Sequence, residues 1–132
     1  MTIHDNIKIV KNFFAAMGDG DQQGLLAVAD EDIEWIVPGL DWPLAGTYRG
    51  HEGLQELQSK AAGDVETSFP EPLEFVAQGD RVIVVGVAFG RIKSTGKPFK
   101  DDFVFAITIR NGKLVSIREY IDTLALARAS AP

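Results

Sequence analysis

The chain has 132 residues, no cysteine, 45% hydrophobic and 24% charged residues, and a formal net charge of −6. This length predicts a single domain over residues 1–132 with a buried core. The negative charge argues against nucleic acid as a partner, because phosphate binding favours a basic surface, and the lack of cysteine excludes disulfides. No apolar run reaches the ~18 residues of a membrane span, and the N-terminus lacks a signal pattern. We therefore expect a cytoplasmic protein with no membrane partner.

Three helices are predicted in the first half of the chain. The first is indicated by apolar residues at spacings of three and four, namely Ile3, Ile7, Val10, Phe14 and Met17. A Gly-Asp-Gly-Asp run at 18–21 ends it, a short helix is expected over 22–29, and a third over about 52–62. Between the second and third we expect a strand over 32–37 and an unusually apolar loop over 38–46.

The second half of the chain is predicted to be β structure. Strand pieces at 65–69 and 73–78 are separated by Pro70-Glu71-Pro72, whose missing amide hydrogens force an edge or a bend. Long strands are expected over 81–93, 99–110 and 113–121, joined by turns at 94–97 and 111–112. The alanine-rich tail over 122–131 forms a short helix at most.

Two acidic residues occupy positions where the last two strands call for core residues. The odd positions of the first of these strands are Phe99, Asp101, Phe103, Phe105, Ile107 and Ile109, and those of the second are Val115, Ile117, Glu119 and Ile121. Alternate residues of a strand share a face, so Asp101 and Glu119 should point inward with the phenylalanines. A buried carboxylate is costly unless it is paired, hydrogen-bonded or functional.

The turn between these strands decides how close the two acids lie. We expect a three-residue turn with Gly112 left-handed, because a two-residue Asn111-Gly112 turn would split the apolar faces. Phe103 then pairs with Glu119, and Asp101 pairs with Ile121. The two acids become diagonal neighbours, with backbones roughly 7–8 Å apart.

The preceding hairpin predicts a hollow beside the acids. Pairing Ser94 with Lys97 sets Gly90 beside Asp101, Ala88 beside Phe103 and Gly86 beside Phe105. Small residues opposite large ones leave space for a ligand. The reverse face of the sheet is too apolar for solvent. We expect a second copy of the chain to cover it as a homodimer, through Val85, Val87, Phe89, Val104 and Ala106.

The order of these elements resembles the nuclear transport factor 2-like fold, a cone-shaped, cystatin-like α+β fold. The segments LAGTYRGHEGLQEL (44–57) and FVFAITIRNGKLVSIREYIDTLAL (103–126) are similar to the SnoaL-like group, which includes polyketide cyclases, ketosteroid isomerase and limonene epoxide hydrolase. The resemblance covers essentially the whole chain. It implies that three N-terminal helices close the concave side of a strongly bent, mostly antiparallel sheet, and that a small apolar molecule binds inside.

The catalytic positions of these relatives are largely replaced. Ketosteroid isomerase uses a tyrosine, an aspartate base and a neutral aspartic acid, and the resemblance places at those positions Phe13, Val37 and Phe105. Limonene epoxide hydrolase has an Arg and an Asp in the long central strand and an Asp in the last strand. The first two fall near Gly86 and Ala88, and the third falls on Glu119. Asp101 falls where that enzyme has an apolar pocket residue.

Two functions remain open from the sequence. In the first, a cofactor-free enzyme uses Glu119 as general base or acid, with Asp101 assisting. In the second, a non-catalytic binding or dimerisation module locks Glu119 in an ion pair with Arg49, Arg91 or His51, and Asp101 reaches solvent. The two histidines are too isolated to form a metal site, and no phosphate-binding loop is present, so we expect neither metal nor cofactor.

A small apolar ligand would be held by a set of mostly aromatic and aliphatic side chains. These candidates are Trp35, Val37, Trp42, Tyr48, Ala88, Phe103, Phe105 and Ile117. Trp35 fits the core equally well, and Tyr48 fits a role as anchor of the loop. Trp42 lies in the loop and is the better candidate for a lid.

Overall fold

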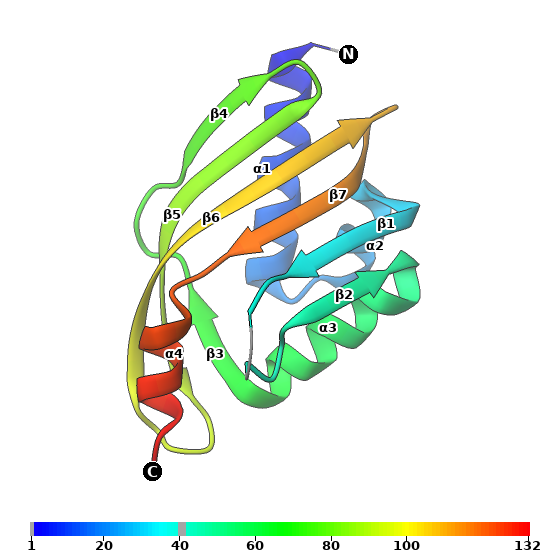
Figure 1. Cartoon of the computed structure of the whole chain (residues 1–132). Helices are drawn as coiled ribbons and strands as arrows, with labels where there is room; N and C mark the ends of the chain where they lie inside the picture. Colours follow the sequence, from blue (N-terminus) through cyan, green and yellow to red (C-terminus); the bar gives the residue numbers. More distant parts are fainter. Residues whose placement is uncertain (1, 40–41) are drawn as a thin grey trace.

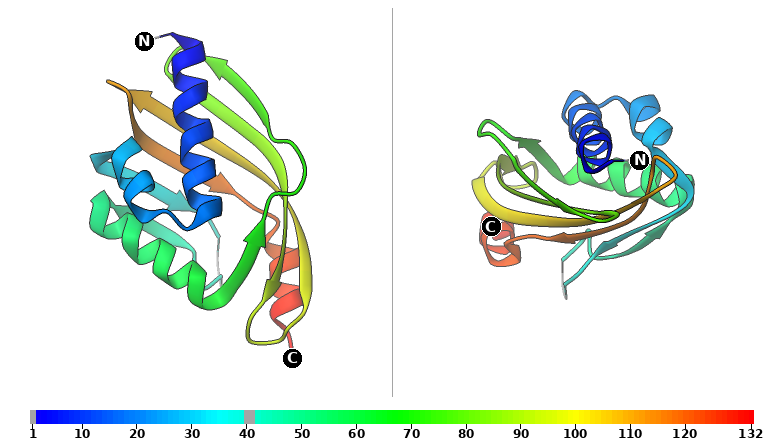
Figure 2. Two further views of the ribbon diagram at one scale, coloured as in Figure 1. Left: turned by 180° about the vertical axis from the view of Figure 1, so that it is seen from behind. Right: turned by 90° about the horizontal axis from the view of Figure 1, so that it is seen from above.

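A curled sheet forms one wall of the molecule, and helices cover its concave side (Figures 1 and 2). The computed structural model describes residues 2–39 and 42–132. In chain order the elements are α1 (Ile3–Asp19), α2 (Gln22–Val28), β1 (Ala29–Val37), β2 (Gly46–Arg49), α3 (Gly50–Asp64), β3 (Val65–Ser68), β4 (Glu74–Gln78), β5 (Arg81–Ile92), β6 (Pro98–Arg110), β7 (Lys113–Tyr120) and α4 (Thr123–Ser130).

The sheet order is β2-β1-β7-β6-β5-β3, and β4 pairs with the first half of β5. Pairing is antiparallel except between β1 and β7. The first and last parts of the chain therefore meet in the middle of the sheet, with α1, α2 and α3 inside the curve (Figure 2). The predicted α+β fold class is confirmed. None of the helices described is long and apolar enough to span a membrane.

The three predicted N-terminal helices are present, and local sequence explains the ends of α1. Thr2 and Asp5 form a capping box at its start, and Gly20 ends it with a φ of 65°. One element was missed. The short strand β2 has no alternating pattern of its own, and it forms by pairing with β1, where Trp35 lies opposite Tyr48. The tail forms the short helix α4, within the predicted limit, after the capping residue Asp122, whose side chain accepts a hydrogen bond from the Ala125 amide.

The predicted turn between β6 and β7 is wrong. Asn111 and Gly112 form a two-residue turn with φ values of 51° and 76°, and Arg110 pairs with Lys113. The ladder then shifts register, because Ile109 pairs with Leu114 but Thr108 pairs with Ser116. Val115 is the extra residue of this β-bulge, which restores the pairing of odd with odd positions. The acids therefore keep the concave face.

The partners predicted for the two acids are also wrong, by two residues. Glu119 pairs with Phe105 rather than Phe103. β7 ends at Tyr120, so Ile121 is not a ladder partner of Asp101. The other hairpin differs by two residues as well, and Asp101 pairs with Ala88.

The shift in that second hairpin comes from its turn. The Ile92 amide donates to the Lys97 carbonyl oxygen at 2.9 Å, and the Gly96 amide donates to the Ile92 carbonyl oxygen at 2.8 Å. The loop thus has four residues, 93–96, where the predicted pairing of Ser94 with Lys97 leaves two. Gly90 consequently pairs with Phe99, and Gly86 pairs with Phe103. An even shift preserves the faces.

Gly90 is required where β3 crosses close to β5. Thr67 of β3 pairs with Gly90. A Cβ atom on Gly90 would collide with the backbone carbonyl oxygen of Glu66 and would come within 2.5 Å of the Phe99 ring. Backbone cannot give way as a flexible side chain can, so this position tolerates no side chain.

We expect Gly90→Ala to lower the free energy of unfolding by about 1–3 kcal/mol through overpacking, as measured by urea denaturation. The matched control is Gly63→Ala in α3, where nothing lies within 4 Å of the added Cβ. That change should be neutral or stabilise by up to about 1 kcal/mol, since Ala favours helix over Gly. Equal stability of the Gly90→Ala variant and the wild type would show that the backbone of β3 is not packed too closely against Gly90 to admit a side chain.

Candidate active site

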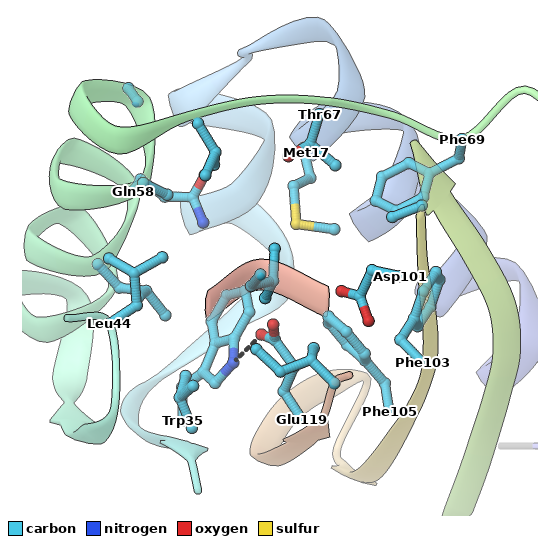
Figure 3. A pocket seen from close by; sticks show the side chains of 18 of the residues that line it. Met17, Trp35, Leu44, Gln58, Thr67, Phe69, Asp101, Phe103, Phe105 and Glu119 are labelled. Carbon is cyan, nitrogen blue, oxygen red and sulfur yellow. Dashed lines mark hydrogen bonds between the residues drawn. The ribbon is translucent and has the colours of Figure 1, made fainter. Parts of the chain in front are cut away.

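A cavity of about 290 Å³ lies between the concave face of the sheet and the helices (Figure 3). Side chains from α1, α3, α4 and most of the strands line it, together with residues of the loops after β1 and β3. Six of the lining side chains are aromatic, namely Trp35, Trp42, Phe69, Phe99, Phe103 and Phe105. A space of this size is at the lower end of the roughly 300–1,000 Å³ typical of small-molecule sites.

Glu119 lies on the wall of this cavity and is bound to Trp35. The indole Nε1 of Trp35 donates to Glu119 Oε1 at 3.0 Å (Figure 3). The parallel pairing of β1 with β7 makes this contact possible, since Trp35 is opposite Ile117, two residues before Glu119. Trp35 therefore does both things expected of it: it is 2% exposed in the core, and it lines the cavity.

The ion pair considered for Glu119 is not formed with any of the three candidate bases. Arg49 Nη2 lies 3.2 Å from Glu34 Oε2. His51 Nε2 lies 2.9 Å from the carbonyl oxygen of Ala29. Arg91 is exposed and forms no salt bridge with Glu119. Glu119 thus meets a hydrogen-bond donor but no cation among the described residues.

Asp101 faces the same cavity and does not reach bulk solvent. It is 5% exposed, and its Oδ1 accepts a hydrogen bond from the backbone amide of Asp122 at 2.7 Å. Asp101 therefore fixes the chain where it leaves β7 and enters α4. No other hydrogen bond to Asp101 is found among the described residues, so Oδ2 is left for the cavity (Figure 3).

Burial raises the pKa of both carboxyl groups. For Glu119 it raises the pKa to about 7, partly offset by the hydrogen bond from Trp35 and reinforced by the charge of Asp101. For Asp101 burial raises the pKa to about 6; the amide of Asp122 lowers it, and the charges of Asp122 and Asp102 raise it. Near neutral pH, Glu119 therefore populates both its protonated and its ionised form, as a proton-transfer group requires.

Most of the predicted ligand-contacting residues line the cavity, and two do not. Those that do are Trp35, Val37, Trp42, Ala88, Phe103 and Phe105, along with Asp101 and Glu119. Tyr48 lies outside, and its hydroxyl donates to the Leu44 carbonyl oxygen at 2.8 Å, so it anchors the loop. Ile117 is fully buried and lies outside as well, because the register shift pairs it with Ile107, away from the cavity. The hollow lies beside Ala88, while phenylalanine rings cover Gly86 and Gly90.

Several lining residues were not among the predicted ligand contacts. Four of them are Met17 of α1, Gln58 of α3, Thr67 of β3 and Phe69 in the loop after β3 (Figure 3), and a fifth is Phe99 of β6. The position of Gln58 could have been predicted from the sequence, because it lies four residues after the buried Leu54 and therefore on the same, covered side of α3. Over residues 2–39 and 42–132, no group of three or more His, Asp or Glu side chains is arranged to hold a metal ion.

We expect Glu119→Gln to stabilise the fold near pH 8 by about 1–3 kcal/mol and to have little effect near pH 5. The raised pKa means that the folded state binds the Glu119 proton more tightly than the unfolded state does. Stability from this group is therefore present at low pH and is lost as pH rises towards and through about 7. Glutamine keeps an acceptor for Trp35 without the charge.

Urea denaturation at the two pH values measures this difference. Glu56→Gln is the matched control, because Glu56 is exposed and pairs with Lys60 on the surface of α3 at 3.5 Å. Its effect should be small at both pH values. A Glu119→Gln variant whose stability relative to wild type is independent of pH would refute the burial of an ionisable Glu119.

Comparison with known proteins identifies the family. A model of the SnoaL-like domain matches residues 10–117. An NTF2-like protein from Burkholderia xenovorans LB400, known as a crystal structure, is 66% identical, with a TM-score of 0.91 and 99% of both chains covered. TerC, co-crystallised with polyporic acid, is 30% identical, with a TM-score of 0.82, 95% of this chain covered and 97% of that chain.

A curated relative is the uncharacterised protein Rv0034 of Mycobacterium tuberculosis, 26% identical over 91% of each chain. The family match spans most of the chain, and the Burkholderia xenovorans crystal structure shares the helices and the curled sheet. The chain belongs to the SnoaL-like family and has the nuclear transport factor 2-like fold.

Proposed function

We propose that the cavity is the active site of a cofactor-free enzyme that transfers a proton on a small apolar substrate. Glu119 moves the proton, Asp101 assists, and the aromatic wall holds the substrate. The reaction class is isomerisation, cyclisation or hydration. The observation that carries the proposal is a pair of carboxyl groups in a mostly apolar cavity, with no cationic partner among the described residues. One of them has a pKa of about 7.

The ligand class has support from a relative. TerC was co-crystallised with polyporic acid and is 30% identical to this chain. That finding concerns TerC, and it favours a small organic molecule as the ligand of this cavity too. The apolar lining adds to this, because buried apolar area supplies binding energy with little dependence on the exact substituents.

The alternative function is a non-catalytic module that binds a small ligand. One observation favours it: the positions that the resemblance aligns with the catalytic groups of ketosteroid isomerase hold Phe13, Val37 and Phe105, all of them buried and apolar. In that case Glu119 would serve to orient Trp35 through their hydrogen bond. Proton exchange on a bound ketone separates the two functions, since a binding module would not catalyse it.

We expect the wild-type protein to accelerate exchange of the α-protons of small cyclic ketones in deuterium oxide, followed by proton NMR. Glu119→Gln should reduce this acceleration at least about 100-fold, since a positioned general base contributes about 10²–10⁴-fold. Glu56→Gln, on the surface, should leave it unchanged. Retained exchange in Glu119→Gln, or no acceleration by the wild type on any ketone tested, would favour the binding module.

We also propose that the chain forms a homodimer through the outer face of the sheet. This face carries Val85 and Tyr120, which are 38% and 49% exposed, together with the partly exposed Val87, Phe89 and Val104. Lys100, Asp102 and Arg118 border these apolar side chains on the same face. Exposed apolar side chains gathered on one face and edged by charged residues are typical of a protein interface. The face lies opposite α1, α2 and α3, so a dimer would leave the concave side as it is (Figure 2).

We expect Val85→Glu to shift the protein from dimer to monomer in sedimentation velocity experiments, because the glutamate would be desolvated in the interface. Ile3→Glu is the control. Ile3 is 44% exposed at the start of α1, away from the outer face. A wild-type protein that sediments as a monomer at all concentrations would rule out this dimer.

A further inference from the structure

The described lining of the cavity includes acidic side chains and no basic side chain. Among the described lining residues, Asp101 and Glu119 are ionisable, and none is Lys, Arg or His. The nearest basic residues along the two strands, Lys100 and Arg118, are exposed and alternate with the acids, so they face the other side of the sheet. Arg118 packs there over the Tyr120 ring, with 5.6 Å from Cζ to the ring centroid.

The aromatic rings of the wall add to this negative character. Asp101 lies on β6 between Phe99 and Phe103, which share its face. Phe103 also contacts Phe69 and Phe105, with ring centroids 5.6 and 5.4 Å apart. The faces of such rings carry a negative quadrupole and attract cations. Carboxylates and ring faces therefore favour the same sign of charge in a ligand.

We propose that the cavity selects small organic cations: molecules with an apolar body that carries a protonated or quaternary amine. The cationic group would lie beside Asp101, against the rings of Phe99 and Phe103. An anionic ligand meets the opposite situation, because it enters only when both carboxyl groups are protonated. A neutral ligand gains the apolar contacts without the charge.

This inference rests on the proposed function and names its substrate class. Asp101 neutralises the cation, which leaves Glu119 free to move the proton. A bound cation also favours the ionised form of Asp101, because opposite charges at short range stabilise each other. Glu119 is held separately, on β7 opposite Phe105, by the hydrogen bond from Trp35 of β1.

Three probes of equal shape and different charge test the proposal. They are choline, its neutral carbon analogue dimethylbutanol, and the anion dimethylbutanoate, each titrated into the wild-type protein near pH 8 and followed by the indole signal of Trp35 in NMR spectra. We expect choline to bind at least about tenfold more tightly than dimethylbutanol, and dimethylbutanoate to bind most weakly. Equal affinities, tighter binding of the anion, or no response to choline would overturn the proposal.

Two adjacent aspartates give a matched pair of variants. Asp101→Asn should reduce the preference for choline over dimethylbutanol to less than about threefold. Asp102→Asn should keep the full preference, since Asp102 is exposed on the other face of β6. A preference that survives Asp101→Asn would show that the carboxylate does not hold the cation. Urea denaturation confirms that both variants fold.

Binding should also depend on pH. The ionisable groups that face the cavity are Asp101 and Glu119, and the carboxylates of Asp102 and Asp122 lie near Asp101. Burial raises the pKa of Asp101 to about 6 and that of Glu119 to about 7, so choline affinity should rise between about pH 5 and pH 8 as these two cavity carboxyl groups ionise. Affinity that falls over this range would contradict the proposal.

The outcome can be separated from that of the ketone exchange experiment. If the cation preference is found and no ketone exchange is catalysed, the cavity is a binding site for cations, and the proposed enzyme function fails. If exchange depends on Glu119 but all three probes bind equally, the enzyme function stands, and organic cations are not its substrate class.

Discussion

The hydrogen bond from Trp35 to Glu119 depends on a parallel pairing between the first and last strands of the sheet. It joins residues 84 positions apart in the chain, and it lies where the sheet curves around the helices. A carboxyl group in this place without the indole would have no donor among the described residues. Burial alone raises its pKa, and the indole offsets part of that effect. The contact therefore orients the Glu119 side chain and keeps its pKa below the value that burial alone would give.

Ionisation of Asp101 and Glu119 in this cavity lowers the free energy of unfolding, because burial disfavours their charged forms. A compact domain buries carboxylates at a free-energy penalty that an ion pair or several hydrogen bonds can reduce. Glu119 and Asp101 each receive a single hydrogen bond among the described residues, and neither receives a salt bridge. Such an arrangement lowers stability near neutral pH, which is typical of residues kept for function rather than for packing. A positively charged ligand beside these carboxylates would reduce that penalty, which is the physical basis of the proposed cation preference.

The alternation of the strands predicted the site better than it predicted their register. The face of the sheet that a residue occupies depends on whether its position in the strand is odd or even. In this hairpin the two-residue turn at Asn111-Gly112 pairs odd positions with even ones, and the bulge at Val115 restores the pairing of odd with odd. Nothing in the alternation of 113–121 marks Val115 as unpaired. The predicted pairing of β6 with β7 therefore differs from the observed pairing by two residues. The parallel pairing of β1 with β7 joins distant segments, and local sequence carries no sign of it. That is why the partner of Glu119 was missed while its orientation was correct.

The register shift changes what the two acids can do together. In the predicted register they are diagonal neighbours, with backbones roughly 7–8 Å apart, so that both side chains could contact one bound molecule. In the structure, Glu119 pairs with Phe105, four residues along β6 from Asp101, which corresponds to roughly 13 Å of extended strand. The backbones of the two acids are thus further apart than predicted, and the charge of Asp101 raises the pKa of Glu119 less than burial does. Under the proposed function, the acids would contact a ligand at two different places, Asp101 at one end and Glu119 at the other.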